Sequence, residues 1–187
     1  RRQRQMCIRD RAEECADKAV TLVKEEKGVL PVTRERYHKI LYYPIESEQG
    51  VAYSVKAGVC DHFRRLLEEE GFSVDTFEPV KGLEGKMQTV NELTEKYDLM
   101  IYLANMSTKS NQTTVRIEWA QPMGANVPVY VNQVPTVFIS VENPYHLLDV
   151  PRVKTFINAY NSNDETLAAV IDKLTGRSEF VLSLIHI

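Results

Sequence analysis

The fold is decided by a seven-residue apolar stretch, LMIYLAN, which runs from Leu99 to Asn105. Every residue before the final asparagine is apolar or aromatic, so the stretch predicts a strand buried on both of its faces. Two further stretches share this character: KILYYPI over 39–45 and TVFISV over 136–141. Strands of this kind are typical of parallel sheets that helices cover on both sides.

The segments around these strands alternate between helical and extended patterns. Apolar residues recur at helical spacing over 52–70, 87–97 and 165–174, and weaker strand patterns cover 72–77 and 154–160. Helices are also expected over 12–26, before Gly28 and Pro31, and over 113–119. The alternation predicts an α/β fold, a three-layer α/β/α sandwich with a mostly parallel open sheet.

Composition and charge narrow the class of protein. The chain has 187 residues, 43% of them hydrophobic and 26% charged, which is typical of one globular domain. Three cysteines do not make a disulfide framework, and no apolar run reaches the ~20 residues of a membrane span. The formal net charge of −3 argues against a nucleic-acid partner.

The two ends of the chain have an unusual nucleotide signature. Met6–Asp10 can be encoded by ATGTGTATAAGAGAC, and Leu182–Ile187 can be encoded by a sequence that contains its reverse complement. Both resemble the end of a transposon-based sequencing adapter. Residues 1–11 and 182–187 are therefore expected to be adapter-derived and non-native, which leaves 12–181 as the domain and places the true N-terminus outside the sequence.

Polar residues gather where the apolar strands end. In open parallel sheets, ligands bind outside the carboxyl ends of the strands. Because Glu, Asn, Ser and Tyr supply the many hydrogen bonds that a sugar requires, these ends predict a rim that faces a substrate or another domain. Its residues are Asn105, Ser107, Glu142, Asn143, Tyr145 and His146. Polar loop ends are also common without any ligand, so both interpretations stand.

Other chemistry has little support. The sequence contains no phosphate-binding or dinucleotide-binding glycine motif, and its histidines lack metal-ligand spacing, so neither a cofactor nor a metal is expected. Cys15 and Cys60 are expected to be small buried hydrophobic residues. Glu118, beside Trp119, is either a semi-buried carboxylate with a raised pKa or a residue of an amphipathic helix whose tryptophan packs in the core.

Three motifs in order resemble one protein family. ADKAVTLVK over 16–24 precedes GVLPV over 28–32, TVFISVENPYHLL spans 136–148, and FINAY over 156–160 precedes a helix that ends near Gly176. Together they resemble the C-terminal α/β domain of glycoside hydrolase family 3. The segment RIEWAQPMGA over 116–125 is similar to Gram-positive bacterial members of its β-N-acetylhexosaminidase branch.

The resemblance implies an accessory domain of a retaining enzyme that releases terminal N-acetylglucosamine. The catalytic (β/α)8 barrel, its aspartate nucleophile and its His–Asp pair would lie outside this sequence, so the fragment itself holds no catalytic residue and is expected to be inactive. The barrel and a carbohydrate substrate are the implied partners. The alternatives are the same domain of a β-glucosidase-like enzyme and a stand-alone flavodoxin-like binding domain. Localisation, whether cytoplasmic or secreted, stays open.

Overall fold

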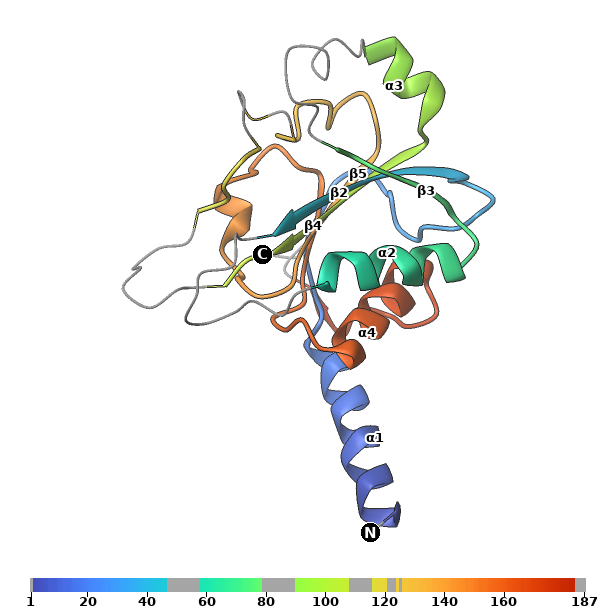
Figure 1. Cartoon of the computed structure of the whole chain (residues 1–187), viewed down its shortest axis with the longest axis vertical. Coiled ribbons are helices and arrows are strands. Elements are labelled where there is room, and N and C mark those ends of the chain that lie inside the picture. Colours follow the sequence, from blue (N-terminus) through green and yellow to red (C-terminus); the bar gives the residue numbers. More distant parts are fainter. Residues whose placement is uncertain are drawn as a thin grey trace.

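A computed structural model describes residues 2–46, 58–78, 90–107, 116–120, 124 and 126–183. Within these residues, seven strands form one sheet in the order β3-β2-β4-β5-β6-β1-β7 (Figure 1). The five strands from β3 to β6 in this order are parallel to one another, whereas β1 is antiparallel to β6. The predicted α/β class and mostly parallel sheet are confirmed.

The apolar stretches form the centre of the sheet. All seven residues of β4 and all five residues of β5 are buried. The strands are β1 (Thr21–Glu25), β2 (Lys39–Glu46), β3 (Ser73–Thr76), β4 (Leu99–Asn105), β5 (Thr136–Ser140), β6 (Thr155–Asn158) and β7 (Leu182–Ser183). The helices are α1 (Arg2–Ala19), α2 (Val59–Glu69), α3 (Val90–Lys96), α4 (Asp164–Thr175) and the short 3₁₀ helix η2 (His146–Leu148).

Two hydrophobic clusters cover the two faces of the sheet. One contains residues of α2, α4 and the end of α1. The other contains residues of α3 and of the irregular chain before β5, and it includes a row of stacked rings that crosses five neighbouring strands or their ends. The rings belong to Phe77, Tyr43, Tyr102, Phe138 and Phe156, with successive centroids 4.2–5.7 Å apart.

Two expected helices are wrong in the part that the structure describes. The helix predicted over 12–26 ends at Ala19, and the chain continues as β1, which pairs with β6. β-branched Val20, Thr21 and Val23 favour this extended conformation once a partner strand is available. Residues 116–119 are irregular rather than helical, and 113–115 lie outside the described residues.

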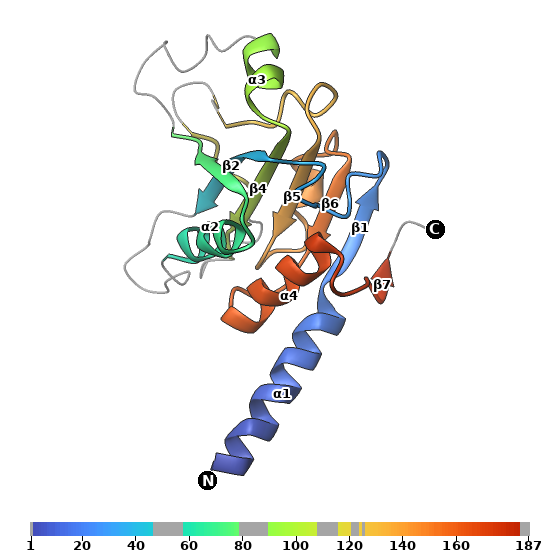
Figure 2. The same cartoon turned by 90° about the vertical axis from the view of Figure 1, so that its right-hand side faces the viewer.

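The chain ends lie at the margin of the fold. Helix α1 extends away from the body, and its residues 7–11 are all exposed (Figures 1 and 2). At the other end, Leu182 and Ser183 of β7 pair with β1 but are exposed. None of the helices in the described ranges combines the length and hydrophobicity that a bilayer span requires.

Candidate functional site

The strand register brings the polar strand ends to a single edge of the sheet. Asn105 lies opposite Glu46, and Ser140 lies between Ala104 and Asn158. The four parallel strands β2, β4, β5 and β6 therefore end together. We call this the carboxyl edge; it also holds the loop 141–146 that follows β5.

The strand order reverses direction at this edge between β2 and β4. From β2 the chain passes outward to β3 and then returns to β4 on the other side of β2. Doubly wound sheets bind ligands at such a switch point. Here Glu46 Oε1 accepts a hydrogen bond of 3.2 Å from the backbone N–H of Cys60, in the first turn of α2. Because this carboxylate lies where the helix N-terminus would attract an anion, it disfavours a phosphate there.

The six predicted rim residues lie at or shortly after strand ends at the carboxyl edge, but they differ in accessibility. Asn105 and His146 are 0% exposed and Asn143 is buried, whereas Ser107 and Glu142 are half-buried. Tyr145 is 71% exposed. Only part of the predicted rim is therefore available to a substrate or partner, while the buried members belong to the framework beneath it.

A buried hydrogen-bond network holds the loop after β5. The hydroxyl of Ser140 donates to the carbonyl of Asn143 at 2.5 Å, and His146 Nδ1 lies 2.9 Å from the same Ser140 Oγ. A hydroxyl has one proton to donate, so His146 must donate from Nδ1–H and keep its lone pair on Nε2. Within the described chain, Nε2 is buried and has no hydrogen-bond partner.

The environment of His146 keeps its ring neutral. Burial lowers the pKa of this histidine below its usual value, and the charge of Asp149 opposes the shift. Burial has the larger effect because the charged imidazolium would lose its hydration. Asp149 also forms an ion pair with Arg116. A neutral, fully buried histidine is an anchor for the loop rather than an accessible acid or base.

Further polar contacts join this loop to β6 and to the segment between β6 and α4. The side-chain amide of Asn158 donates to the carbonyl of Pro144 at 3.1 Å, and the Ser162 hydroxyl donates to Glu142 Oε1 at 2.5 Å. The amide N–H of Tyr145 donates to Asn143 Oδ1 at 3.0 Å. Sequence analysis did not select Asn158 or Ser162 as site residues. A polar residue inside the apolar run FINAY is the signal that would have pointed to Asn158.

Other candidates from the sequence have other positions. Cys60 is buried as expected, whereas the expectation for Cys15 is wrong, because this residue of α1 is exposed. Glu118 is exposed, so the semi-buried carboxylate is wrong, while the half-buried Trp119 packs against the second hydrophobic cluster. Among the described residues, no group of three or more His, Cys, Asp or Glu side chains is arranged to hold a metal ion.

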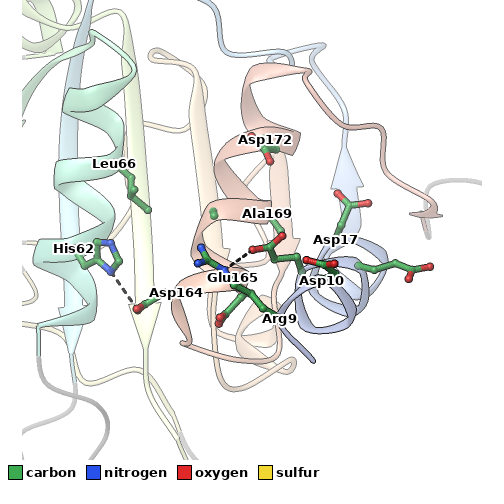
Figure 3. A pocket seen from close by; sticks show the side chains of 12 residues that line it. Arg9, Asp10, Asp17, His62, Leu66, Asp164, Glu165, Ala169 and Asp172 are labelled. Atoms are coloured by element: carbon green, nitrogen blue, oxygen red, sulfur yellow. Dashed lines mark hydrogen bonds and ion pairs between the residues drawn. The ribbon is translucent and has the colours of Figure 1, made fainter. Parts of the chain in front are cut away.

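A cavity of about 720 Å³ lies between α1, α2 and α4 (Figure 3). Most of its lining side chains are acidic, and Figure 3 shows Asp164 pointing toward His62, with Nδ1 and Oδ1 3.5 Å apart. Arg9 and Asp10 of the exposed N-terminal segment also line it. A second cavity, of about 280 Å³, lies at the amino edge near Thr136, where Lys27, Arg36 and Lys154 are already bonded within the chain.

The chain is similar to parts of longer proteins that are already known. No protein-family model matches the chain. A curated relative from Cellulomonas fimi, named β-N-acetylglucosaminidase/β-glucosidase, is 52% identical over 170 residues, which cover 90% of this chain and 30% of the relative. The solved β-glucoside phosphorylase BglX is 41% identical, with a TM-score of 0.75, 90% of this chain covered and 29% of that protein.

A more distant structure has the same fold. A glycoside hydrolase family 3 β-N-acetylglucosaminidase from Paenibacillus is 16% identical with a TM-score of 0.58, and the match covers 92% of this chain and 32% of that protein. The chain therefore matches an α/β part of longer proteins. The resemblance to the C-terminal α/β domain of glycoside hydrolase family 3 is confirmed. The chain spans about a third of the length of the relatives it matches.

Proposed function

We propose that this chain is the C-terminal α/β domain of a retaining β-N-acetylhexosaminidase that releases terminal N-acetylglucosamine. The observation that carries the proposal is the 52% identity over 170 residues to the Cellulomonas β-N-acetylglucosaminidase/β-glucosidase. The catalytic (β/α)8 barrel lies outside the present sequence. A barrel aspartate would attack the anomeric carbon and break its bond to the aglycone, which would leave as an alcohol with a proton from the barrel's His–Asp pair. Water would then hydrolyse the covalent intermediate and release the sugar.

In this proposal the domain walls one side of the sugar cleft and supplies no catalytic group. The carboxylates at the described carboxyl edge support this, because they are engaged within the fold. Glu46 caps the first turn of α2, and Glu142 accepts a hydrogen bond from Ser162. Of the six rim residues, Tyr145, Glu142 and Ser107 are accessible enough to face the sugar or the barrel. Asn105, Asn143 and His146 would shape the rim from beneath.

A second candidate has a specific observation in its favour. BglX, which is 41% identical to this chain, is named a β-glucoside phosphorylase. The parent would then act on β-glucosides, or would transfer the glycosyl group to phosphate instead of water. The domain would keep the same supporting role in either case, since the sugar and the acceptor would be selected mainly by the barrel.

The test is to recover the complete reading frame from the source DNA and to express the full parent protein. Hydrolysis of p-nitrophenyl β-N-acetylglucosaminide well above that of the matched glucoside is expected, in the absence of phosphate. Preference for the glucoside, or formation of a sugar 1-phosphate when phosphate is added, would favour the second candidate. If the reading frame has its start codon just before Ala12 and the protein acts on neither sugar, the remaining interpretation is a stand-alone binding domain.

We also propose that residues 1–11 and 182–187 are non-native. The match to the Cellulomonas relative spans 170 residues, as many as the segment 12–181 contains. Residues 7–11 are exposed on the part of α1 that extends from the body (Figure 2). Long-read sequencing of the same source DNA tests this: the codons for both ends should be absent, and their presence in the intact gene would refute it.

A further inference from the structure

The smaller cavity, of about 280 Å³, lies at the amino edge of the sheet, where the parallel strands begin. In Figure 2 this edge is at the end of the sheet farthest from the projecting helix α1, so it is separate from the carboxyl edge. Three connections meet around the cavity: the loop from β1 to β2, the chain that leads into β5, and the residue before β6. A ligand there would contact segments that are far apart in the sequence.

The inner wall of this cavity is apolar and preformed. Val29, Tyr37, Val131 and Val134 line it, and each of them is at most 6% exposed. The Tyr37 hydroxyl donates to the carbonyl of Val29 at 3.1 Å, which fixes the position of the ring. Sites for small molecules commonly combine such an apolar wall with a few polar groups that orient the ligand.

The polar side chains with charge at this cavity are all cationic. Lys27, Arg36 and Lys154 line it, and among the described residues no Asp or Glu side chain does. The Lys27 ammonium has one contact within the described chain, with the carbonyl of Asn132 at 3.4 Å. A neutral carbonyl does not cancel the charge of the ammonium, so Lys27 can still attract an anion.

Arg36 is held in place but keeps unused hydrogen-bond donors. Its Nη2 donates to the carbonyl of Gly28 at 2.8 Å, Nη1 donates to that of Pro31 at 3.3 Å, and Cζ lies 5.1 Å from the centre of the Tyr37 ring. A guanidinium has five N–H donors. Within the described residues, its Nε–H and one Nη2–H have no acceptor. A fixed arginine with free donors is well suited to bind a planar carboxylate.

The neighbouring carboxylates limit the charge that the cavity can accept. Glu26 forms ion pairs with Lys24 and Lys154, and Glu25 Oε1 accepts a hydrogen bond of 2.7 Å from the N–H of Val29. Neither glutamate lines the cavity. The three lining cations and these two carboxylates together leave one positive charge, which suits an anion that carries a single negative charge.

We propose that this cavity binds a small organic monoanion: a carboxylate on a planar apolar body. The carboxylate would accept hydrogen bonds from Arg36 and Lys27, and the apolar body would contact Tyr37 and the valines of the inner wall. Because water occupies about 30 Å³ per molecule, the cavity has room for roughly nine non-hydrogen atoms, which is the size of benzoate. The site is independent of the activity proposed for the parent.

Titration of the present chain with benzoate, followed by the methyl NMR signals of its valines, tests the proposal. The signals of Val29, Val131 and Val134 should shift, with half-saturation near about 1 mM, while those of Val170 in α4 should not. Benzyl alcohol lacks the charge, acetate lacks the ring, and inorganic phosphate lacks the apolar body. Each should bind at least about tenfold more weakly than benzoate. Equal binding of any of the three, or shifts confined to other valines, would overturn the proposal.

Substitutions at the cavity give a second readout. Arg36→Lys keeps the charge but loses the planar guanidinium, so it should weaken benzoate binding at least about tenfold. Lys27→Gln should weaken it about threefold, because this ammonium is exposed to solvent. Arg34→Gln is the matched control, because Arg34 is an exposed arginine that does not line the cavity, and it should bind benzoate as the unmodified chain does.

Urea unfolding without benzoate shows whether each variant folds. Lys27→Gln removes only one long contact with a carbonyl, so its unfolding midpoint should equal that of the unmodified chain. If this folded variant and Arg34→Gln bind benzoate equally well, the cationic rim does not select the ligand and the proposal is wrong. Activity of the parent on p-nitrophenyl sugars is a separate measurement, so an inactive parent would reject the glycosidase without affecting the anion site.

Discussion

His146 shows how a buried titratable side chain is used as a structural anchor. Its ring is fully buried and hydrogen-bonded to Ser140, and this pair holds the turn that presents Tyr145. The loop is held by His146 in one neutral tautomer, so the stability of the loop depends on this imidazole remaining uncharged.

Because the folded pKa of His146 lies below the unfolded value of about 6.5, the unfolded chain binds the proton more readily. The free energy of unfolding should therefore fall as the pH is lowered below about 6.5, and should be constant above that pH as far as this group is concerned. Urea unfolding between pH 8 and pH 5 measures it. His146→Gln should remove this pH-dependent component, whereas His62→Gln, which changes a partly exposed histidine, should retain it. An unchanged slope in His146→Gln would contradict the assignment.

Lys173 is a second buried charge, and it joins three parts of the chain. Its ammonium lies 3.0 Å from Asp17 of α1, 3.1 Å from Ser178 Oγ and 2.7 Å from the carbonyl of Glu179. The side chain is 0% exposed and all three of its protons have acceptors. The Ser178 hydroxyl also donates a hydrogen bond to Asp17, which lies 161 positions earlier in the chain. Lys173, Asp17 and Ser178 are therefore all in contact with one another.

Lys173→Met should lower the free energy of unfolding by about 2–4 kcal/mol, because Asp17 and the Glu179 carbonyl lose their partner. Asp17→Asn should cost less, because the amide oxygen at this position still accepts a hydrogen bond from the Lys173 ammonium and only the opposite charge is lost. Urea unfolding of both variants at pH 7 measures the difference. Equal losses, or none, would show that the buried lysine does not hold α1 to the body.

Helix α4 has a capping residue at each end. Asn163 caps its start, with Oδ1 accepting a 2.9 Å hydrogen bond from the N–H of Thr166, and Gly176 ends it with a φ of +78°. Its apolar side chains bury against the same face of the sheet as α2. The helix also carries Lys173, so its position determines where α1 is attached.

Asn163→Ala should lower the free energy of unfolding by about 1 kcal/mol, because one N–H of the first turn loses its acceptor. Asn163→Asp keeps an acceptor at the same position and should be nearly neutral. Thermal or urea unfolding of the two variants beside the unmodified chain gives the comparison. If Ala and Asp behave alike, the cap contributes nothing measurable.

The chain as a whole has a compact body with a projecting N-terminal helix. The part of α1 that lies over 7–11 is exposed, and its Arg9–Glu13 ion pair is open to solvent. Exposed ion pairs and terminal segments add little to stability. The two-residue strand β7 is likewise exposed on both of its residues.

Removal of residues 1–11 and 182–187 should change the free energy of unfolding by less than about 1 kcal/mol. The comparison is between the chain 12–181 and the chain 1–187, by urea unfolding and circular dichroism. A larger loss would mean that the ends are integral to the fold, and would count against their adapter origin. A control that removes residues 1–20 should be strongly destabilised, because Ala16, Asp17 and Val20 pack against the body.

The local pattern of residues was sufficient to predict the central strands and the α/β class of the fold. A strand such as β4 is buried on both faces, so six consecutive apolar residues and the asparagine that ends it identify it without knowledge of its neighbours. The same argument placed the predicted rim at strand ends. The pattern over 20–26 was ambiguous, because Val20 and Val23 fit either a helix or a strand, and only pairing with β6 made it extended.

The tertiary structure alone decided which rim residues are accessible and which are framework. Asn105 is the last residue of β4 and Tyr145 lies in the loop after β5, yet Asn105 is fully buried and Tyr145 is 71% exposed. The contacts of His146 with Ser140, and of Lys173 with Asp17, join atoms whose positions depend on the packing of whole elements. Burial and long-range hydrogen bonds arise from the arrangement of the sheet and helices, whereas strand and helix preferences arise from neighbouring residues in the chain.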